Sequence, residues 1–187
     1  MIEVALDLFH QKGIIATSVD EILEKSGTGK GQFYHYFKNK EDLIHEVLQY
    51  FYQQLRNEQL PPKINLETWT DLENWFDVFI DFEKSIKCKR SCPIGTIGSD
   101  LGDSQDLLRQ DIKLVFEFTR YCLSRFFVGL KAKNQLPKSI DPGTLADLCF
   151  TVQQGGMLVS KIERNCDPFE RSARQLLKLL KDLTISG

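Results

Sequence analysis

The sequence predicts an all-α protein, and three observations support this fold class. Apolar residues recur with helical spacing in almost every segment of the chain. No segment shows the alternation of apolar and polar residues that indicates a β-strand. The prolines and several of the glycines fall between the periodic segments or at their borders, where helices are expected to begin or end. We expect about nine helices, divided between a small three-helix domain at residues 1–46 and a larger helical domain at residues 47–187.

Composition and length narrow the class of protein. The 187 residues are 42% hydrophobic and 27% charged, which is the balance of a globular protein. No apolar run approaches the roughly 20 residues of a membrane span, and no secretory signal is recognisable at the start. The five cysteines are an odd number with irregular spacing, which favours reduced thiols and a cytoplasmic location.

Three short helices are expected first. The periodic stretch 2–12 ends at Gly13, a residue type that commonly follows a helix. Ser18 and Glu21 have the spacing of a capping box, which would begin a second short helix. A glycine-containing turn at 26–29 precedes a third helix at residues 30–37.

Longer helices are expected after this point. Asn39 is a suitable N-cap for a fourth helix that continues to about Leu60 and stops before two prolines. A short helix is expected directly after Cys92. The other helices are expected at residues 68–87, 107–133, 142–164 and 168–185.

The second and third helices, joined by a tight glycine turn, have the form of a helix-turn-helix. The exposed side of the third helix carries side chains that suit DNA. Lys30 can donate to guanine, and Gln32 can pair with adenine through two hydrogen bonds. Gly31 has no side chain, so the backbone can approach base edges closely. Thr17 and Ser18 lie at the start of the second helix, where free N–H groups favour a phosphate.

The net charge alone does not indicate nucleic acid. The first 47 residues contain five lysines and eight acidic residues, and the whole chain has a formal charge of −2. A DNA-binding domain usually has a basic excess. Between residues 26 and 40, however, there are three lysines and no acidic residue. The DNA-binding hypothesis therefore depends on the local placement of residues.

The stretch from Thr17 to Leu43 resembles the signature of the TetR family of bacterial repressors, and the match spans about residues 2–47. The resemblance implies an all-α homodimer whose helix-turn-helix domain is joined by a long fourth helix to a ligand-binding domain. It implies base contacts at the start of the third helix, from Thr28, Lys30, Gly31 and Gln32. It implies phosphate contacts from Thr17, Tyr34, His35 and Lys40. Family members usually carry a basic arm before the first helix, whereas the helix here begins directly after Met1.

The larger domain is rich in aromatic residues that could line an apolar ligand cavity. The candidate ligand-binding residues are Trp75, Phe79, Phe82, Phe116, Tyr121 and Phe126. The alternative is that these side chains simply fill the core between helices. Since few charged residues are available to line such a cavity, we expect a small hydrophobic or aromatic effector.

Cys88 and Cys92 lie at a predicted helix break and allow a second hypothesis. Their spacing is not that of a zinc site and no histidine is near, so no metal and no cofactor are expected. Neighbouring basic residues could lower a thiol pKa, which would allow a redox-responsive regulator. The alternative is that both are ordinary cysteines.

The last two helices carry apolar stripes that suit a homodimer interface, in which two helices from each subunit form a four-helix bundle. The candidate interface residues are Leu148, Val152, Gly155, Gly156 and Val159 in the first stripe, and Phe169, Ala173, Leu176, Leu177 and Leu180 in the second. The alternative is that both stripes face the core of the same chain.

Together these features predict a ligand-responsive transcriptional regulator, and a repressor by family default, that binds an inverted-repeat operator in double-stranded DNA as a homodimer. No catalytic constellation is present, so an enzyme is not expected. One alternative is a helical small-molecule-binding protein whose helix-turn-helix is degenerate. Another is a DNA-binding dimer that has no ligand.

Overall fold

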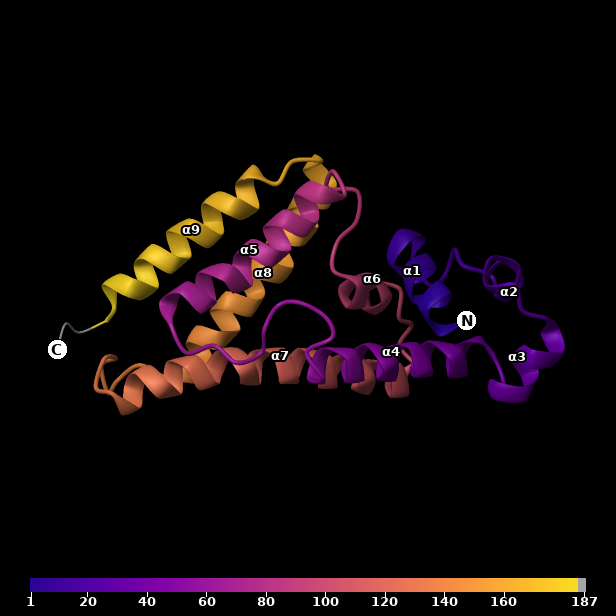
Figure 1. Cartoon of the computed structure of the whole chain (residues 1–187), viewed down its shortest axis with the longest axis horizontal. Coiled ribbons are helices and arrows are strands. Elements are labelled where there is room, and N and C mark those ends of the chain that lie inside the picture. The colour runs from indigo at the N-terminus through magenta and orange to yellow at the C-terminus, as the bar shows by residue number, and fades with distance from the viewer. Residues whose placement is uncertain (185–187) are drawn as a thin grey trace. The chain divides into compact units, whose positions relative to one another are not determined.

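The computed structural model describes residues 1–184, and within this range it contains nine helices and no strand (Figure 1). The all-α prediction is therefore confirmed. The helices are α1 (Ile2–Lys12), α2 (Val19–Ser26), α3 (Lys30–Tyr36), α4 (Lys40–Arg56), α5 (Trp69–Ser85), α6 (Pro93–Ser99), α7 (Asp106–Ala132), α8 (Pro142–Glu163) and α9 (Asp167–Asp182). The expected end of the last helix at residue 185 lies outside the described residues.

Side-chain caps explain where several helices begin. The Ser18 hydroxyl accepts a hydrogen bond from the backbone N–H of Glu21, and the Asn39 side chain accepts one from the backbone of Asp42 at 2.9 Å. These bonds satisfy N–H groups that have no partner inside the helix. Only one of the two hydrogen bonds of the predicted capping box forms, the one that Ser18 accepts. The Glu21 carboxylate, which would accept from the N–H of Ser18, pairs with Lys12 and Lys25 instead.

The helix ends differ slightly from expectation. α4 ends at Arg56, four residues before the predicted Leu60. The reason is local, since Glu58 takes a left-handed backbone conformation with φ of 54°, which cannot continue an α-helix. α3 ends one residue early because Phe37 is extended.

The chain folds into two compact units. The first unit comprises Met1–Asn57 and Cys92–Val115, and the second comprises Glu58–Ser91 and the chain from Phe116 onward. The first unit is therefore discontinuous in sequence, because α6 and the beginning of α7 belong with the N-terminal helices. α7 is one continuous helix that contributes residues to both units. The assignment of DNA binding to residues 1–46 and of ligand binding to residues 47–187 stays a prediction.

In the first unit, α1 packs against α4, α6 and α2. The core of this unit is apolar, and its fully buried side chains include Phe9, Ile22, Phe33, Leu43 and Ile97. The short helix α6 lies beside α1, which is also visible in Figure 1. α2 in turn packs against α3.

In the second unit, α5, α8 and α9 lie side by side (Figure 1). α8 and α9 approach especially closely at Gly156, where an added Cβ would lie 2.0 Å from the ring of Phe169. Three ion pairs join α5 to α9 along the surface: Lys84 with Glu170, Asp77 with Arg174, and Glu73 with Lys181. None of the helices in the described range is both long and apolar enough to cross a membrane.

Candidate nucleic-acid interface

The turn between α2 and α3 is built around Gly27. Its backbone is left-handed, with φ of 65°, and its N–H bonds back to the last turn of α2. The N–H of Thr28 donates to the carbonyl of Leu23 at 3.0 Å, which completes the helix end. Phe33 and Phe37 are buried behind α3, with ring centroids 5.4 Å apart. This arrangement fixes which face of α3 points to solvent.

The exposed face of α3 carries most of the predicted base-contacting residues. Lys30, Gly31 and Gln32 are exposed, while Thr28 before the helix is half-buried. A Cβ added at Gly31 would meet nothing within 4 Å. The chain itself therefore gives no steric reason for glycine at this position. We expect that the reason is the close approach of another molecule to the backbone of α3.

Three ring-bearing side chains of α3, those of Tyr34, His35 and Tyr36, are exposed. The exposed fraction is 67% for Tyr34 and 65% for Tyr36, and His35 is exposed as well. Tyr34 and His35 were among the predicted phosphate contacts, but Tyr36 was not. Its position four residues after Gln32, on the same helix face, is the signal that could have identified it.

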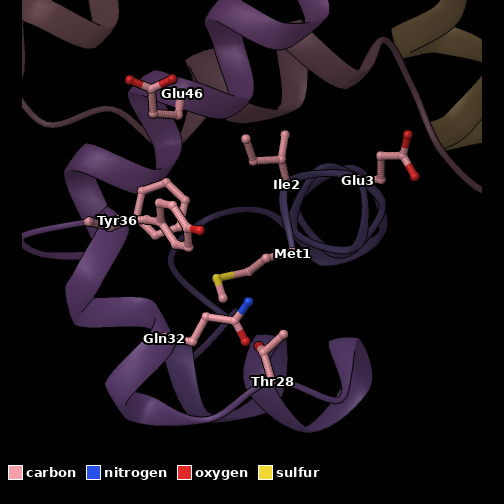
Figure 2. A pocket seen from close by; sticks show the side chains of 8 residues that line it. Met1, Ile2, Glu3, Thr28, Gln32, Tyr36 and Glu46 are labelled. Atoms are coloured by element: carbon pink, nitrogen blue, oxygen red, sulfur yellow. The ribbon is translucent and has the colours of Figure 1, made fainter.

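A groove of about 600 Å³ lies against this face of α3. Figure 2 shows the thioether of Met1 and the amide of Gln32 pointing into the same space, with the ring of Tyr36 beside them. Glu3 and Glu46 also line the groove. The groove therefore combines an apolar surface with carboxylates, and the start of α1 lines it together with the exposed face of α3.

Lys30 has a partner within the unit. Its ammonium lies 3.0 Å from the carboxylate of Asp20 in α2, and both side chains are more than 70% exposed. The hydrogen bond to Asp20 raises the pKa of Lys30. An exposed pair of this kind contributes little to stability, so Lys30 is free to exchange Asp20 for another acceptor.

The two residues at the start of α2 are placed differently. Ser18 is exposed, and its hydroxyl remains able to donate while it caps the helix. Thr17 has an exposed fraction of only 1%, and its hydroxyl donates to the carbonyl of Gly13 at 2.7 Å. In this arrangement the Thr17 side chain supports the α1–α2 turn and is not presented to solvent. Its assignment to a phosphate stays a prediction.

Lys40 also has an internal role. Its ammonium donates to the carbonyl of Ile14, and partial burial lowers its pKa, while the charge of Asp100 acts in the opposite direction. Asp100 in turn accepts a hydrogen bond from the N–H of Ile15 at 3.2 Å and lies directly over Gly13. We refer to these contacts of Thr17, Lys40 and Asp100 with residues 13–15 as the turn clamp. A phosphate contact from Lys40, which stays a prediction, would have to displace Ile14.

A buried carboxylate connects α4 to the start of α7. Asp111 has an exposed fraction of 4%. One carboxylate oxygen lies 2.7 Å from Nδ1 of His45, and the other accepts a hydrogen bond from Gln49 at 2.7 Å. We call this contact the Asp111 latch. Sequence reasoning missed it, because an acidic residue in an amphipathic helix is usually exposed to solvent.

The predicted ligand-binding aromatics of the second unit make different ring contacts. Trp75 contacts Phe79 with ring centroids 5.0 Å apart, whereas Phe116 pairs with Phe150, and Phe126 pairs with Trp69 and Phe127. Trp75 and Phe126 are buried, and Phe79, Phe82 and Phe116 are half-buried. Tyr121 is 60% exposed. Their role in ligand binding stays a prediction.

The two apolar stripes predicted for a dimer differ in exposure. In α9, the side chains of Phe169, Ala173, Leu176, Leu177 and Leu180 are all buried within the single chain. In α8, Leu148 and Val159 are 44% and 38% exposed, Gly155 is exposed, and Val152 and Gly156 are half-buried. The exposed stripe of α8 continues through two residues that sequence reasoning did not select, Leu158 and Ile162.

Cys88 and Cys92 lie in different units. Cys88 is buried, and this burial raises the pKa of its thiol, which lowers the fraction of reactive thiolate. Cys92 caps α6 and accepts a hydrogen bond from the N–H of Gly95 at 3.4 Å. Among residues 1–184, no group of three or more histidine, cysteine or acidic side chains is arranged to hold a metal ion.

Comparisons with known families cover most of the chain. The family described as bacterial regulatory proteins, tetR family, matches residues 1–47. The tetracyclin repressor-like C-terminal domain matches residues 69–176, which is more than half of the chain.

Individual relatives agree with the family matches. The transcriptional regulator AcuR of Cereibacter sphaeroides is 29% identical over 93% of this chain and 80% of its own length. The HTH-type transcriptional repressor DhaR of a Mycobacterium species is 25% identical over 91% of this chain and 85% of its length. The crystal structure of a regulatory protein TetR from Rhodobacter sphaeroides shares the fold, with a TM-score of 0.83 and 24% identity over 98% of this chain and 96% of that one.

Proposed function

Because the chain belongs to the tetR family of bacterial regulatory proteins, we propose that this transcriptional regulator is a homodimeric repressor that binds an inverted-repeat operator. A small effector with an apolar body would bind the second unit and release the DNA. The observation that carries the proposal is the exposed face of α3, where Lys30 and Gln32 flank a glycine that nothing in the chain requires. Such a regulator would act in the cytoplasm, where the DNA is.

Base recognition is assigned to the first turn of α3. Lys30 would leave Asp20 and donate to guanine, and Gln32 would pair with adenine. Thr28, which now shares a hydrogen bond with Ser26 at 2.7 Å, would contact the same groove. The open space at Gly31 supports this assignment, because a larger side chain would hold the helix backbone away from the base edges.

Phosphate contacts would fix the position of α3 on the duplex without reading the sequence. Tyr34, His35 and Ser18 are exposed and carry polar groups able to donate a hydrogen bond. We add Tyr36 to this set on the basis of its exposure. Thr17 and Lys40 would contribute only if the turn clamp opens, since both now bond to backbone carbonyls of residues 13 and 14.

Dimer formation is assigned to the exposed stripe of α8 and to two exposed leucines, Leu179 in α9 and Leu183 directly after it. Such apolar exposure on one helix face suits an isologous contact, in which the same surface of two subunits meets. The buried residues of α9 would then act indirectly, by holding α9 against α8. A monomer in sedimentation at micromolar concentration would contradict this assignment.

Release of DNA would pass through α7, because this helix belongs to both units. A shift of α7 caused by an effector would act on α4 through the Asp111 latch. The effector can lower operator affinity only to the extent that it binds the released conformation more tightly. A tenfold release requires about 1.4 kcal/mol of this difference.

The direct test is selection of an operator from a random DNA pool with the purified protein. We expect an inverted repeat whose half-sites are separated by about one helical turn, roughly 34–36 Å, or a multiple of it. Failure to enrich any sequence would contradict the proposal and favour a ligand-binding protein with a degenerate helix-turn-helix.

A Lys40→Ala variant tests the phosphate contact. If Lys40 reaches a phosphate, this variant should bind all DNA sequences more weakly, and its binding should depend less steeply on salt.

A further inference from the structure

The second unit contains a groove that the proposed function does not assign. Its volume is about 230 Å³, and it lies between the segment before α5 and the C-terminal half of α7. The floor is apolar: Leu66, Phe126 and Leu130 line it and are each no more than 6% exposed. Trp69 packs against Phe126 in a T-shaped pair, with ring centroids 5.1 Å apart. The floor is therefore buried and apolar, which suits a small hydrocarbon body.

The rim of this groove is basic. Arg125, Gly129 and Lys133 follow one another at intervals of four residues, so they lie along one side of α7 and its C-terminal turn. A Cβ added at Gly129 would meet nothing within 4 Å, so the space between the two cations is open. At a rise of about 1.5 Å per residue, the Cα atoms of Arg125 and Lys133 lie roughly 12 Å apart along the helix axis.

Neither cation is neutralised within the unit. Among residues 1–184, the side chains of Arg125 and Lys133 have no hydrogen-bond or ion-pair partner, and both are exposed. One acidic residue, Glu67, lines the opposite wall, where its carboxylate accepts a hydrogen bond from Asn65 at 3.0 Å. The lining side chains therefore carry two positive charges and one negative charge.

From this juxtaposition we propose that the groove binds a small carboxylate with an apolar chain or ring. The hydrocarbon body would cover Phe126 and Leu130, in the space above Gly129. The carboxylate would accept two hydrogen bonds from the Arg125 guanidinium, whose planar fork matches carboxylate geometry, while Lys133 would add a second positive charge. The inference deepens the ligand-responsive part of the proposed function, because it specifies that the apolar effector carries a negative charge.

The test measures binding of hexanoate to the full-length protein by calorimetry, without DNA and at constant ionic strength. Hexanol and hexylamine serve as the uncharged and cationic probes of the same chain length. We expect hexanoate to bind at least tenfold more tightly than hexanol and hexylamine not to bind. Equal binding of hexanoate and hexanol, or no binding of hexanoate, would overturn the proposal.

Three variants locate the site. Arg125→Gln with Lys133→Gln should weaken hexanoate binding at least tenfold, and Gly129→Leu should abolish it by filling the open space. Lys138→Gln, an exposed lysine outside the groove, is the matched control and should bind like the wild type. Binding that is unchanged in both the charge and the filling variants would place hexanoate elsewhere and overturn the inference. Because no DNA is present, failure here leaves operator recognition to its own test.

Discussion

The two units differ in the kind of contact that stabilises each of them internally. In the first unit, helices distant in sequence are joined by polar groups, namely the turn clamp around Gly13 and the Asp111 latch. In the second unit, α8 and α9 meet through close apolar packing at Gly156 and Phe169, and the ion pairs between α5 and α9 lie at the surface. The first unit therefore adds directional polar bonds between distant segments to its apolar core, whereas the α8–α9 contact of the second unit depends on shape.

This difference bears on function. An intramolecular hydrogen bond contributes only about 0.5–1.5 kcal/mol net, so water or phosphate can replace it at small cost. Close-packed side chains resist displacement, because a shift creates either overlap or a void. Under the proposed function, the polar contacts of the first unit would let it adjust on DNA, whereas the close packing of the second unit would hold a dimer interface and a ligand site in a fixed geometry.

Glu83 is an exception to the apolar packing of the second unit. Its substitution has the largest expected effect on folding stability. It is fully buried, and in residues 1–184 neither carboxylate oxygen has a hydrogen-bond partner. Burial raises the pKa of Glu83 to about 7, although the charge of Lys161 acts in the opposite direction. Below a pH of 4.5, the ordinary pKa, the group is mostly protonated in both states, and as the pH rises to 7 only the unfolded chain loses the proton.

Folding stability should therefore fall across this pH range. The Glu83 contribution to this loss is about 3 kcal/mol, at roughly 1.36 kcal/mol per pKa unit. The Glu83→Gln variant should be more stable than the wild type by this amount at about pH 8 and nearly equal to it at about pH 4. Urea denaturation at both values measures the effect. Parallel stability differences at the two pH values would show that Glu83 does not titrate in this way.

Two adjacent glycines provide the next test of packing in α8. Gly155→Ala and Gly156→Ala both gain about 1 kcal/mol of helix propensity. Only at Gly156 does the new methyl group overlap Phe169, since a Cβ at Gly155 meets nothing within 4 Å. Overpacking costs about 1–3 kcal/mol, so the two variants should differ by about 2 kcal/mol, with Gly156→Ala the less stable. Thermal denaturation of the pair checks this, and equal melting temperatures would contradict the tight α8–α9 contact.

The Asp111 latch tests the polar side of the comparison. In Asp111→Asn, one oxygen can still accept from Gln49, but the amide nitrogen faces His45 and the charge is lost. A hydrogen bond to a charged group contributes about 1.5–3 kcal/mol, so we expect a loss of about 1.5 kcal/mol in urea denaturation. Asp103→Asn, at an exposed position of the same unit, is the control and should leave the free energy of unfolding unchanged. Identical effects of the two substitutions on the free energy of unfolding would show that the Asp111 latch does not stabilise the fold.

The Asp20–Lys30 pair gives the smallest expected effect. Asp20→Asn removes an exposed ion pair, which contributes little to the free energy of unfolding. Because the variant also removes a negative charge next to the recognition face, it should bind all DNA sequences several-fold more tightly and discriminate less among them. Fluorescence anisotropy with operator and random duplexes measures both quantities. Weaker binding would mean that Asp20 positions Lys30 for DNA instead of restraining it.

Much of the helical architecture follows from the sequence. Periodicity located the helices, and the caps at Ser18, Asn39 and Cys92 explain three of their starts. The end of α4 was not predictable, because the left-handed conformation after it is adopted by Glu58 and not by a glycine, the residue type that usually indicates it. Periodicity also cannot show which helix an apolar stripe meets. Phe169 and Leu177 were expected at a dimer interface, but they are buried against helices of the same chain.

The candidate DNA site was only partly predictable for a related reason. Residue type indicates what a side chain can donate, but the neighbouring backbone determines where it points. Thr17 and Lys40 are suitable phosphate donors by type, yet the α1–α2 turn offers both of them carbonyl acceptors nearby. Asp100 and Asp111 gave no signal, because their partners lie far away in sequence. Gln32 and Tyr34 are exposed as expected, because Phe33 between them is buried and fixes the helix face.

On the proposed function, α3 reads base pairs in an operator. The most direct measurement compares wild-type protein with Lys30→Ala by fluorescence anisotropy, on the selected operator and on single base-pair variants of it. We predict a loss of about 1–3 kcal/mol on the operator, together with loss of discrimination at one base pair in each half-site. If Lys30→Ala binds the operator and all its variants with wild-type affinity, α3 does not read DNA as described.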